Sequence, residues 1–397
     1  MMSEITKPRL INMCNIYMLL WVLYSFHWFE VVNTPALNSL SNAFLGFNLI
    51  LSFYYCFYCL FNYRLPKLYY AILILVLLLA LYGLVSVLKG EELYIRFTGE
   101  KYRNGSYIIG PMRSFLPFFA FYVFSKRGLL TKESLIIWGG ISLLQFLFVF
   151  FHSSTEYAVG SFVNNNGYHF TVLLPLLFFI RRPRFLPIGL LVFLIAMVIL
   201  GMKRGAILVA AFFVIYYLFI ILQKEKTARK LFIIIAVLVV FRLGYSYFND
   251  FYANNSILQH RVDSTLEGSS SGRSILYAQA WSIWSQSNYF QLVFGHGASA
   301  SLKYLDNFIH NDWLELLLDT GIVGVIAFLA FWISFITEWI RSRDNRLLFA
   351  VLGGYIVVLL PRTFYGMMYS NLQTIAVMAI TYCITVNNNS SSRGQKR

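Results

Sequence analysis

The stretch FIHNDWLELLLDTGIVG, from Phe308 to Gly324, ends a long polar interruption over about residues 247–311, and apolar sequence resumes within it. His310 and Asn311 stand at the edge of the apolar sequence. Three carboxylates follow: Asp312, Glu315 and Asp319. The spacing i, i+3, i+7 puts them on one face of a helix. Because carboxylates in membrane helices seldom face lipid, we expect this face to point into a polar cavity or an ion-paired interior.

The full chain has the composition of a multi-pass membrane protein, with 58% hydrophobic and only 12% charged residues. A helix needs roughly 20 mostly apolar residues to cross a bilayer. Dividing the apolar runs where basic or Gly, Pro and Asn residues interrupt them predicts an all-α bundle of twelve membrane helices. The predicted spans are 12–30, 43–63, 68–88, 107–124, 135–151, 168–180, 186–202, 205–222, 231–246, 313–340, 347–361 and 371–387.

The basic residues give these spans an orientation, because short cytoplasmic loops are enriched in Lys and Arg. Placing both termini in the cytoplasm puts most of the 32 Lys and Arg residues inside. They fall in seven short segments around positions 7–9, 64–67, 126–132, 181–184, 224–230, 341–346 and 393–397. The net charge of +15 is therefore a signal of topology, and it gives no reason to expect nucleic acid as a partner.

This orientation divides the chain into four parts. Helices one to nine occupy 1–246, an extracytoplasmic loop with short helices and part of the active site occupies 247–311, helices ten to twelve occupy 312–387, and a cytoplasmic tail occupies 388–397. Within the loop, apolar positions recur at helical spacing after Arg273 and predict an amphipathic surface helix that starts there.

Basic residues outside the predicted cytoplasmic segments need another explanation. Lys203 and Arg204 lie in GMKRGAIL, a short outer turn, where they can either extend to lipid phosphates or bind an anion. Arg273 opposes the helix dipole at the start of its helix, and a bound anion would relieve that mismatch. Arg113 and Arg362 can each form a structural pair or contact an anion.

The residues around His310 also have structural explanations. Asn311 or Asp312 can be a helix cap, Glu315 and Asp319 can pair with buried arginines, and a single histidine is often structural. The closeness of these groups in one corner of the sequence favours a catalytic site with His310 at its centre.

Five segments of the chain resemble the superfamily of O-antigen ligases and O-antigen polymerases, which are bacterial envelope glycosyltransferases. They are GSFVNNNGYHFTVLLPL (160–176), GMKRGAILVA (201–210), SGRSILYAQAWSIW (271–284), FGHGAS (294–299) and HNDWLELLLDTGIVGVIAF (310–328). Their order and spacing agree with the family over about residues 155–330. The family often has serine where this chain has Lys203.

The resemblance implies transfer of a glycan from undecaprenyl diphosphate to an acceptor hydroxyl, at the outer face of the bacterial cytoplasmic membrane. The departing diphosphate gathers negative charge, which Arg204 and Arg273 suit, with Lys203 assisting. His310 is the candidate base for the acceptor hydroxyl. Direct displacement would invert the anomeric configuration. Asn311, Asp312, Glu315, Arg113 and Arg362 are possible supporting residues.

Neither a cofactor nor a metal is expected, because the outer carboxylates Asp263, Glu267 and Asp306 form no ligand cluster. The richness in Phe and Tyr (38 and 27) favours a repeat-unit polymerase, whose acceptor is lipid-linked, over a ligase that glycosylates lipid A-core. By family analogy, a chain-length regulator is a possible partner. A transporter or flippase remains a more distant alternative, although no internal repeat supports it.

Overall fold

The computed structural model describes residues 12–28, 35–90, 105–152, 166–180, 185–201, 203–223, 273–366 and 368–394, with the pairs 93–94, 101–102, 155–156 and 162–163 and a few single positions. The predicted span 231–246, the loop residues 247–258 and 260–272, and Asn164 and Asn165 lie outside the described residues. Helices dominate the described part. Its four strands, of two residues each, form two antiparallel pairs.

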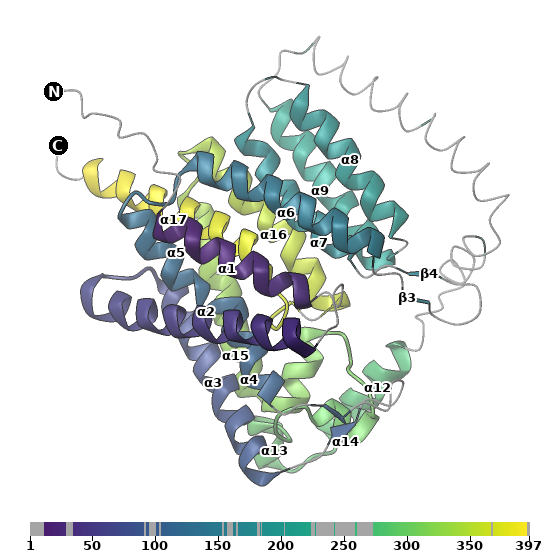
Figure 1. Cartoon of the computed structure of the whole chain (residues 1–397). Coiled ribbons are helices and arrows are strands. Elements are labelled where there is room, and N and C mark those ends of the chain that lie inside the picture. Colours follow the sequence, from purple (N-terminus) through teal and green to yellow (C-terminus); the bar gives the residue numbers. More distant parts are fainter. Residues whose placement is uncertain are drawn as a thin grey trace.

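Figure 1 shows the elements in their order along the chain. The first half contains α1 (Met13–Trp28), α2 (Pro35–Asn62), α3 (Lys67–Lys89), β1 (Leu93–Tyr94), β2 (Lys101–Tyr102), α4 (Gly105–Phe115), α5 (Pro117–Lys126), α6 (Lys132–His152), β3 (Thr155–Glu156), β4 (Phe162–Val163), α7 (Gly167–Leu173), the 3-10 helix η1 (Leu174–Phe179), α8 (Leu186–Leu200) and α9 (Arg204–Leu222). The second half contains α12 (Arg273–Ser285), α13 (Tyr289–Phe294), α14 (Ala300–Leu305), α15 (Asp312–Arg341), α16 (Arg346–Tyr365) and α17 (Thr374–Gly394).

Seven helices of the described part are long and apolar enough to cross a membrane. They are Ala36–Asn62, Lys67–Lys89, Gly105–Lys126, Lys132–His152, Arg204–Leu222, Asp312–Arg341 and Arg346–Tyr365. Three apolar helices are shorter: Met13–Ser25, Gly167–Phe179 and Leu186–Leu200. The protein is therefore helical and multi-pass. A helix coincides with every predicted span that falls on described residues, but twelve crossings and the orientation remain predictions.

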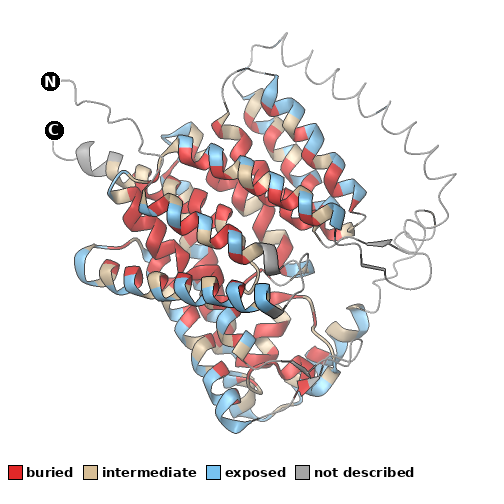
Figure 2. Ribbon diagram, viewed as in Figure 1, coloured by how far each residue is buried: buried red, intermediate tan, exposed pale blue. Residues whose placement is uncertain are grey.

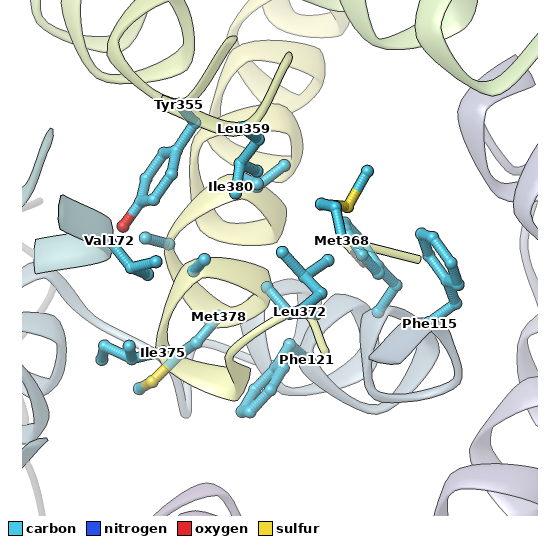
Figure 3. Packing of buried hydrophobic residues seen from close by; sticks show 14 of the residues in the cluster. Phe115, Phe121, Val172, Tyr355, Leu359, Met368, Leu372, Ile375, Met378 and Ile380 are labelled. Carbon is cyan, nitrogen blue, oxygen red and sulfur yellow. The ribbon is translucent and has the colours of Figure 1, made fainter. Parts of the chain in front are cut away.

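Helix α17 lies in the middle of the bundle. Its polar second half explains why its hydropathy is too low for a candidate membrane span. Its first half is buried on all sides, and its second half reads NNNSSSRG. Figure 3 shows Ile375, Met378 and Ile380 of α17 among side chains from other helices, including Phe121 of α5 and Tyr355 of α16. The exposed apolar residues lie on the outer helices, as expected for surfaces that face lipid (Figure 2).

Several described helix ends meet at one end of the bundle. Asn12 Nδ2, just before α1, donates to the carbonyl of Leu129 at 3.3 Å. Lys126 Nζ, at the end of α5, donates to Asn389 Oδ1 of α17 at 2.5 Å. The start of α1 and the last turns of α17 therefore lie beside the basic connection between α5 and α6, which is the arrangement that the predicted topology requires.

A close backbone contact joins the cap, which we define as α12–α14, to α15. The cap gathers at one end of the bundle, beside the ends of α3 and α15 (Figure 1). Gly321 interrupts α15 with φ 66° and ψ −159°, and Gly295 has φ 72° and ψ −170°; only glycine adopts these backbone angles readily. A Cβ atom on Gly321 would lie 2.4 Å from the Val293 carbonyl oxygen, and one on Gly295 would lie 2.3 Å from that of Asp319. Both glycines are needed for the two backbones to approach.

We therefore expect Gly321→Ala to destabilise the protein by about 1–3 kcal/mol, because alanine adds backbone strain and an overlap with Val293. The thermal midpoint of unfolding in detergent measures the loss. Gly140→Ala in α6 is the matched control, since no atom lies within 4 Å of the added Cβ, and its midpoint should stay equal or rise slightly. Equal midpoints for both variants would contradict this account of the contact.

Candidate functional site

The segment that carries His310 is fixed at both sides by hydrogen bonds to α15. Asn311 caps the helix, and its Oδ1 accepts from the backbone N–H groups of Trp313 at 3.0 Å and Leu314 at 3.2 Å. The helix cap considered from the sequence is thus Asn311. His310 itself has φ 57°, a left-handed conformation that is uncommon for a residue with a side chain.

Glu315 holds the other side of this segment. Its Oε2 accepts from the backbone N–H of Ile309 at 2.9 Å, and its Oε1 accepts from the Ser301 hydroxyl. Glu315 is 1% exposed, so both bonds are shielded from water. One carboxylate thereby connects α14, the residue before His310 and α15.

The two other carboxylates of this helix face act in the same way. Asp319 Oδ1 accepts from the backbone N–H of Ala300 at 2.8 Å, and Asp312 Oδ2 accepts from that of Met368 at 2.9 Å. Asp312 and Asp319 are fully buried. Within the described part of the chain, no Lys or Arg forms a salt bridge with either of them or with Glu315.

The expectation of a polar cavity or an ion-paired interior therefore needs correction. Buried carboxylates need hydrogen-bond donors, and backbone N–H groups of the cap and of the turn after α16 provide them here. Sequence spacing indicated the shared face but could not indicate these partners, because any residue type offers a backbone N–H.

Basic residues from two segments meet around His310. Arg273 begins α12, Lys203 precedes α9, and Arg204 begins α9. Both Arg273 and Lys203 act electrostatically on His310, and Arg204 and Arg273 act on each other. All four side chains are half-buried. Grouped positive charges repel one another, so an anion bound among them would stabilise the arrangement.

His310 is neutral in this environment at physiological pH. Burial lowers the pKa of His310 to about 4, and the positive charges of Arg273 and Lys203 act in the same direction. A neutral imidazole can accept a proton. A bound anion would offset the two positive charges and make His310 a stronger base at the moment when an anionic ligand is present.

Two tyrosines lie in the same region, and no sequence pattern singles them out. The Tyr277 hydroxyl of α12 donates to the Phe364 carbonyl at 3.1 Å, which connects the cap with the end of α16. The Tyr168 hydroxyl donates to the Tyr365 carbonyl at 3.4 Å. A Cβ atom on Gly205 would lie 2.0 Å from that hydroxyl, so the glycine after Lys203 and Arg204 makes room for Tyr168.

Arg362 lies behind this region. Its guanidinium is 5.3 Å from the centroid of the Tyr168 ring, and its Nη2 donates to the Asn371 carbonyl at 3.3 Å. It is buried, and it acts electrostatically on Asp312. The ring of Tyr168 thus contacts Arg362 as well as the Gly205 backbone. A supporting role for Arg362 remains a prediction.

The hydrogen bonds of Arg113 give a structural explanation for its burial. It donates to the Tyr24 hydroxyl at 3.0 Å, to the Ser370 carbonyl at 2.8 Å and to Asn371 Oδ1 at 2.6 Å. These bonds hold the turn after α16, whose Met368 N–H is bonded to Asp312. The structure brings Lys203, Arg204, Arg273 and His310 together, and Arg113 contacts the turn that Asp312 also holds.

The described residues include no group of three His, Cys, Asp or Glu side chains arranged to hold a metal ion. The predicted outer residues Asp263 and Glu267 lie outside the described residues, and Asp306 is exposed at the end of α14. The site as described therefore offers positive charge, a neutral imidazole and tyrosine hydroxyls as its chemistry.

These features define a multi-pass membrane protein with a cationic site and a histidine at one end of its helices. Residues 189–329 match the family described as O-antigen ligase. This match supports the resemblance of this part of the chain to the superfamily of O-antigen ligases and polymerases. The matched range contains Lys203, Arg204, Arg273 and His310. The comparison with curated proteins gives no match.

The two hydrogen bonds of Glu315 predict that Glu315→Met strongly destabilises the protein. Methionine keeps the length of the side chain and removes both acceptor oxygens. The Ile309 N–H and the Ser301 hydroxyl would then be buried without partners, at about 1–3 kcal/mol each. Ser301→Ala is the matched control because it leaves the Ile309 bond in place. The thermal midpoint should fall much further for Glu315→Met, and equal losses would contradict the role given to this carboxylate.

The electrostatics predict that Arg273→Gln raises the pKa of His310, because it removes a positive charge that opposes protonation. Only neutral imidazole reacts with diethyl pyrocarbonate, so the pH dependence of modification, followed by mass spectrometry, reports this pKa. In the unmodified chain the midpoint should lie near pH 4, and in Arg273→Gln it should lie higher.

Lys303→Gln is the control for this measurement. Burial lowers the pKa of His296, and the charge of Lys303 lowers it further. Lys303→Gln should therefore shift the midpoint of His296 upward and leave that of His310 unchanged. A midpoint of His310 that is the same in Arg273→Gln and in the unmodified chain would show that the two side chains are not close neighbours.

Proposed function

We propose that this protein transfers an oligosaccharide from an undecaprenyl-diphosphate carrier to an acceptor sugar hydroxyl, as a repeat-unit polymerase of a bacterial surface polysaccharide. The observation that carries the proposal is the convergence of Arg204, Arg273 and Lys203 around a neutral His310. The match to the O-antigen ligase family over residues 189–329 supports the class of reaction.

In this reaction the cations bind the donor's diphosphate. Arginine offers a planar fork of N–H donors that fits phosphate oxygens, whereas lysine acts as a point charge. Arg204 and Arg273 therefore take the oxygens, and Lys203 adds charge. Their positive charge stabilises the diphosphate as it leaves, because negative charge collects there in the transition state.

His310 takes the proton of the acceptor. The hydroxyl oxygen forms a bond to the anomeric carbon while the bond from that carbon to the phosphate oxygen breaks, and the bonding electron pair departs with undecaprenyl diphosphate. The hydroxyl proton moves to the neutral imidazole. Attack opposite the leaving group inverts the anomeric configuration. In this scheme the cations take the place of a divalent metal, so activity persists in EDTA.

Polymerase and ligase share this donor site and differ in the acceptor. The abundance of Phe and Tyr, 38 and 27 residues, favours a polymerase adapted to one repeat unit. The description of the matching family as O-antigen ligase favours the alternative, in which lipid A-core accepts the finished glycan. For either reaction, the protein lies in the bacterial inner membrane with the site facing the periplasm. A polymerase can also work with a chain-length regulator.

The test is complementation of a strain deleted for this gene with His310→Ala and with Arg273→Ala, read from the glycan ladder on gels. A polymerase predicts that polymer is lost from both strains while core-linked glycan of a single repeat remains. The loss follows because one variant lacks the base and the other lacks a cation at the leaving group. Membrane abundance is measured alongside.

Lys303→Ala is the matched control, since it removes an exposed basic residue of the cap outside the proposed site. Its ladder should match that of the unmodified gene. Loss of all core-linked glycan, with polymer still built on the lipid carrier, identifies a ligase instead. An unchanged ladder in both site variants would refute the proposed site and favour a transporter or flippase.

A further inference from the structure

Helix α13 exposes a row of apolar side chains on one face. Tyr289 is 89% exposed and Phe290 is 70% exposed, and Val293 and Phe294 follow four residues later on the same side. The rings of Phe290 and Phe294 lie 4.9 Å apart and form one surface. Aromatic side chains exposed to this degree are unusual in water and typical of a membrane interface.

The contact with α15 gives the depth of this surface in the membrane. Val293 lies against Gly321, where an added Cβ would be 2.4 Å from the Val293 carbonyl oxygen. From Gly321 to Arg341, which begins the basic connection to α16, α15 rises about 30 Å at 1.5 Å per residue. A bilayer's hydrocarbon core is about 30 Å thick. Gly321, and with it α13, is therefore level with the outer edge of the hydrocarbon.

The contact with α3 gives an independent measure of depth. The Tyr82 hydroxyl donates to the Phe294 carbonyl at 2.6 Å. Tyr82 lies about 22 Å along α3 from Lys67, the basic residue at its other end, and about 10 Å before Lys89. Tyr82 is thus within the length of α3 that spans the hydrocarbon. Both contacts place α13 at membrane depth, and they come from different helices.

The backbone of α13 also suits a position without water. In lipid, every backbone polar group needs a partner within the protein. Three of the last four carbonyls of α13 have such partners: Gln291 accepts from Gly295 N–H at 2.7 Å, Leu292 accepts from Trp284 Nε1 at 3.2 Å, and Phe294 accepts from Tyr82. At its start, Asn288 Oδ1 accepts from the Gln291 N–H at 2.9 Å.

The exposed face continues into surfaces that already face lipid. Ile322, next to Gly321, and Ile326 are exposed on α15, and Leu84 and Leu88 are exposed on α3. Both helices are long and apolar enough to cross the membrane. We propose that α13 is inserted into the outer leaflet, with Tyr289, Phe290, Val293 and Phe294 against phospholipid acyl chains, and that it anchors the cap to the membrane.

Spin labelling in proteoliposomes tests this directly. A nitroxide at Phe290→Cys should collide readily with oxygen and rarely with the water-soluble complex NiEDDA. Leu81→Cys, at a 58% exposed site of α3, is the lipid-facing reference, and Arg343→Cys, between α15 and α16, is the water-facing one. Phe290 is mostly exposed, so its replacement removes little packing. The unmodified chain, whose four cysteines are all buried, gives the background.

The proposal predicts that the Phe290→Cys label has the same oxygen and NiEDDA accessibilities as the Leu81→Cys label. Its NiEDDA accessibility should be far below that of Arg343→Cys. NiEDDA accessibility equal to that of Arg343→Cys would overturn it and place the face in water. Dipolar broadening of the Phe290→Cys spectrum that disappears on dilution with unlabelled protein would also overturn it, because a second copy of the chain would then cover the face.

Discussion

The hydrogen bond from the Ile309 N–H to the Glu315 carboxylate determines where His310 stands. Glu315 belongs to a long membrane helix, and Ile309 belongs to the segment that leads into it. Because the carboxylate is almost fully buried, breaking this bond leaves a charge and a donor without water. The segment is thereby tied to the most rigid kind of element in the protein.

Charge controls the chemistry at that position. Arg273 and Lys203 keep the pKa of His310 low, which would make it a weak base in the empty site. In the proposed reaction the same cations bind the donor's diphosphate, whose negative charge would cancel their effect on the imidazole. Donor binding and activation of the base would then be one electrostatic event. In the proposed reaction this coupling would limit proton abstraction from stray hydroxyls when no donor is bound.

Local signals in the sequence predicted much of this arrangement. Apolar runs predicted the described membrane helices. The polar-to-apolar boundary predicted the start of α15 at Asp312, and the amphipathic pattern predicted the start of α12 near Arg273. Asn311 was among the expected caps. The partners of the buried carboxylates were not predictable, because Ala300, Ile309 and Met368 contribute backbone N–H groups that carry no sequence signature. The place of Tyr168 follows from packing against Gly205, which is also invisible in a linear pattern.

Depth in the membrane connects the anchor with the site. Helix α9 is 19 residues long, or about 28 Å, so in the predicted topology Arg204 at its start would stand near the same outer edge of the hydrocarbon as Gly321. The phosphates of a lipid-linked donor lie at this level, since its chain is in the hydrocarbon and its glycan is in water. The contacts of the cap with α15 and α3 hold Arg273 near Arg204, and the proposed lipid contacts of α13 would strengthen this hold at the level of the donor's phosphates. The aromatic face of α13 would then serve the proposed reaction from outside the site.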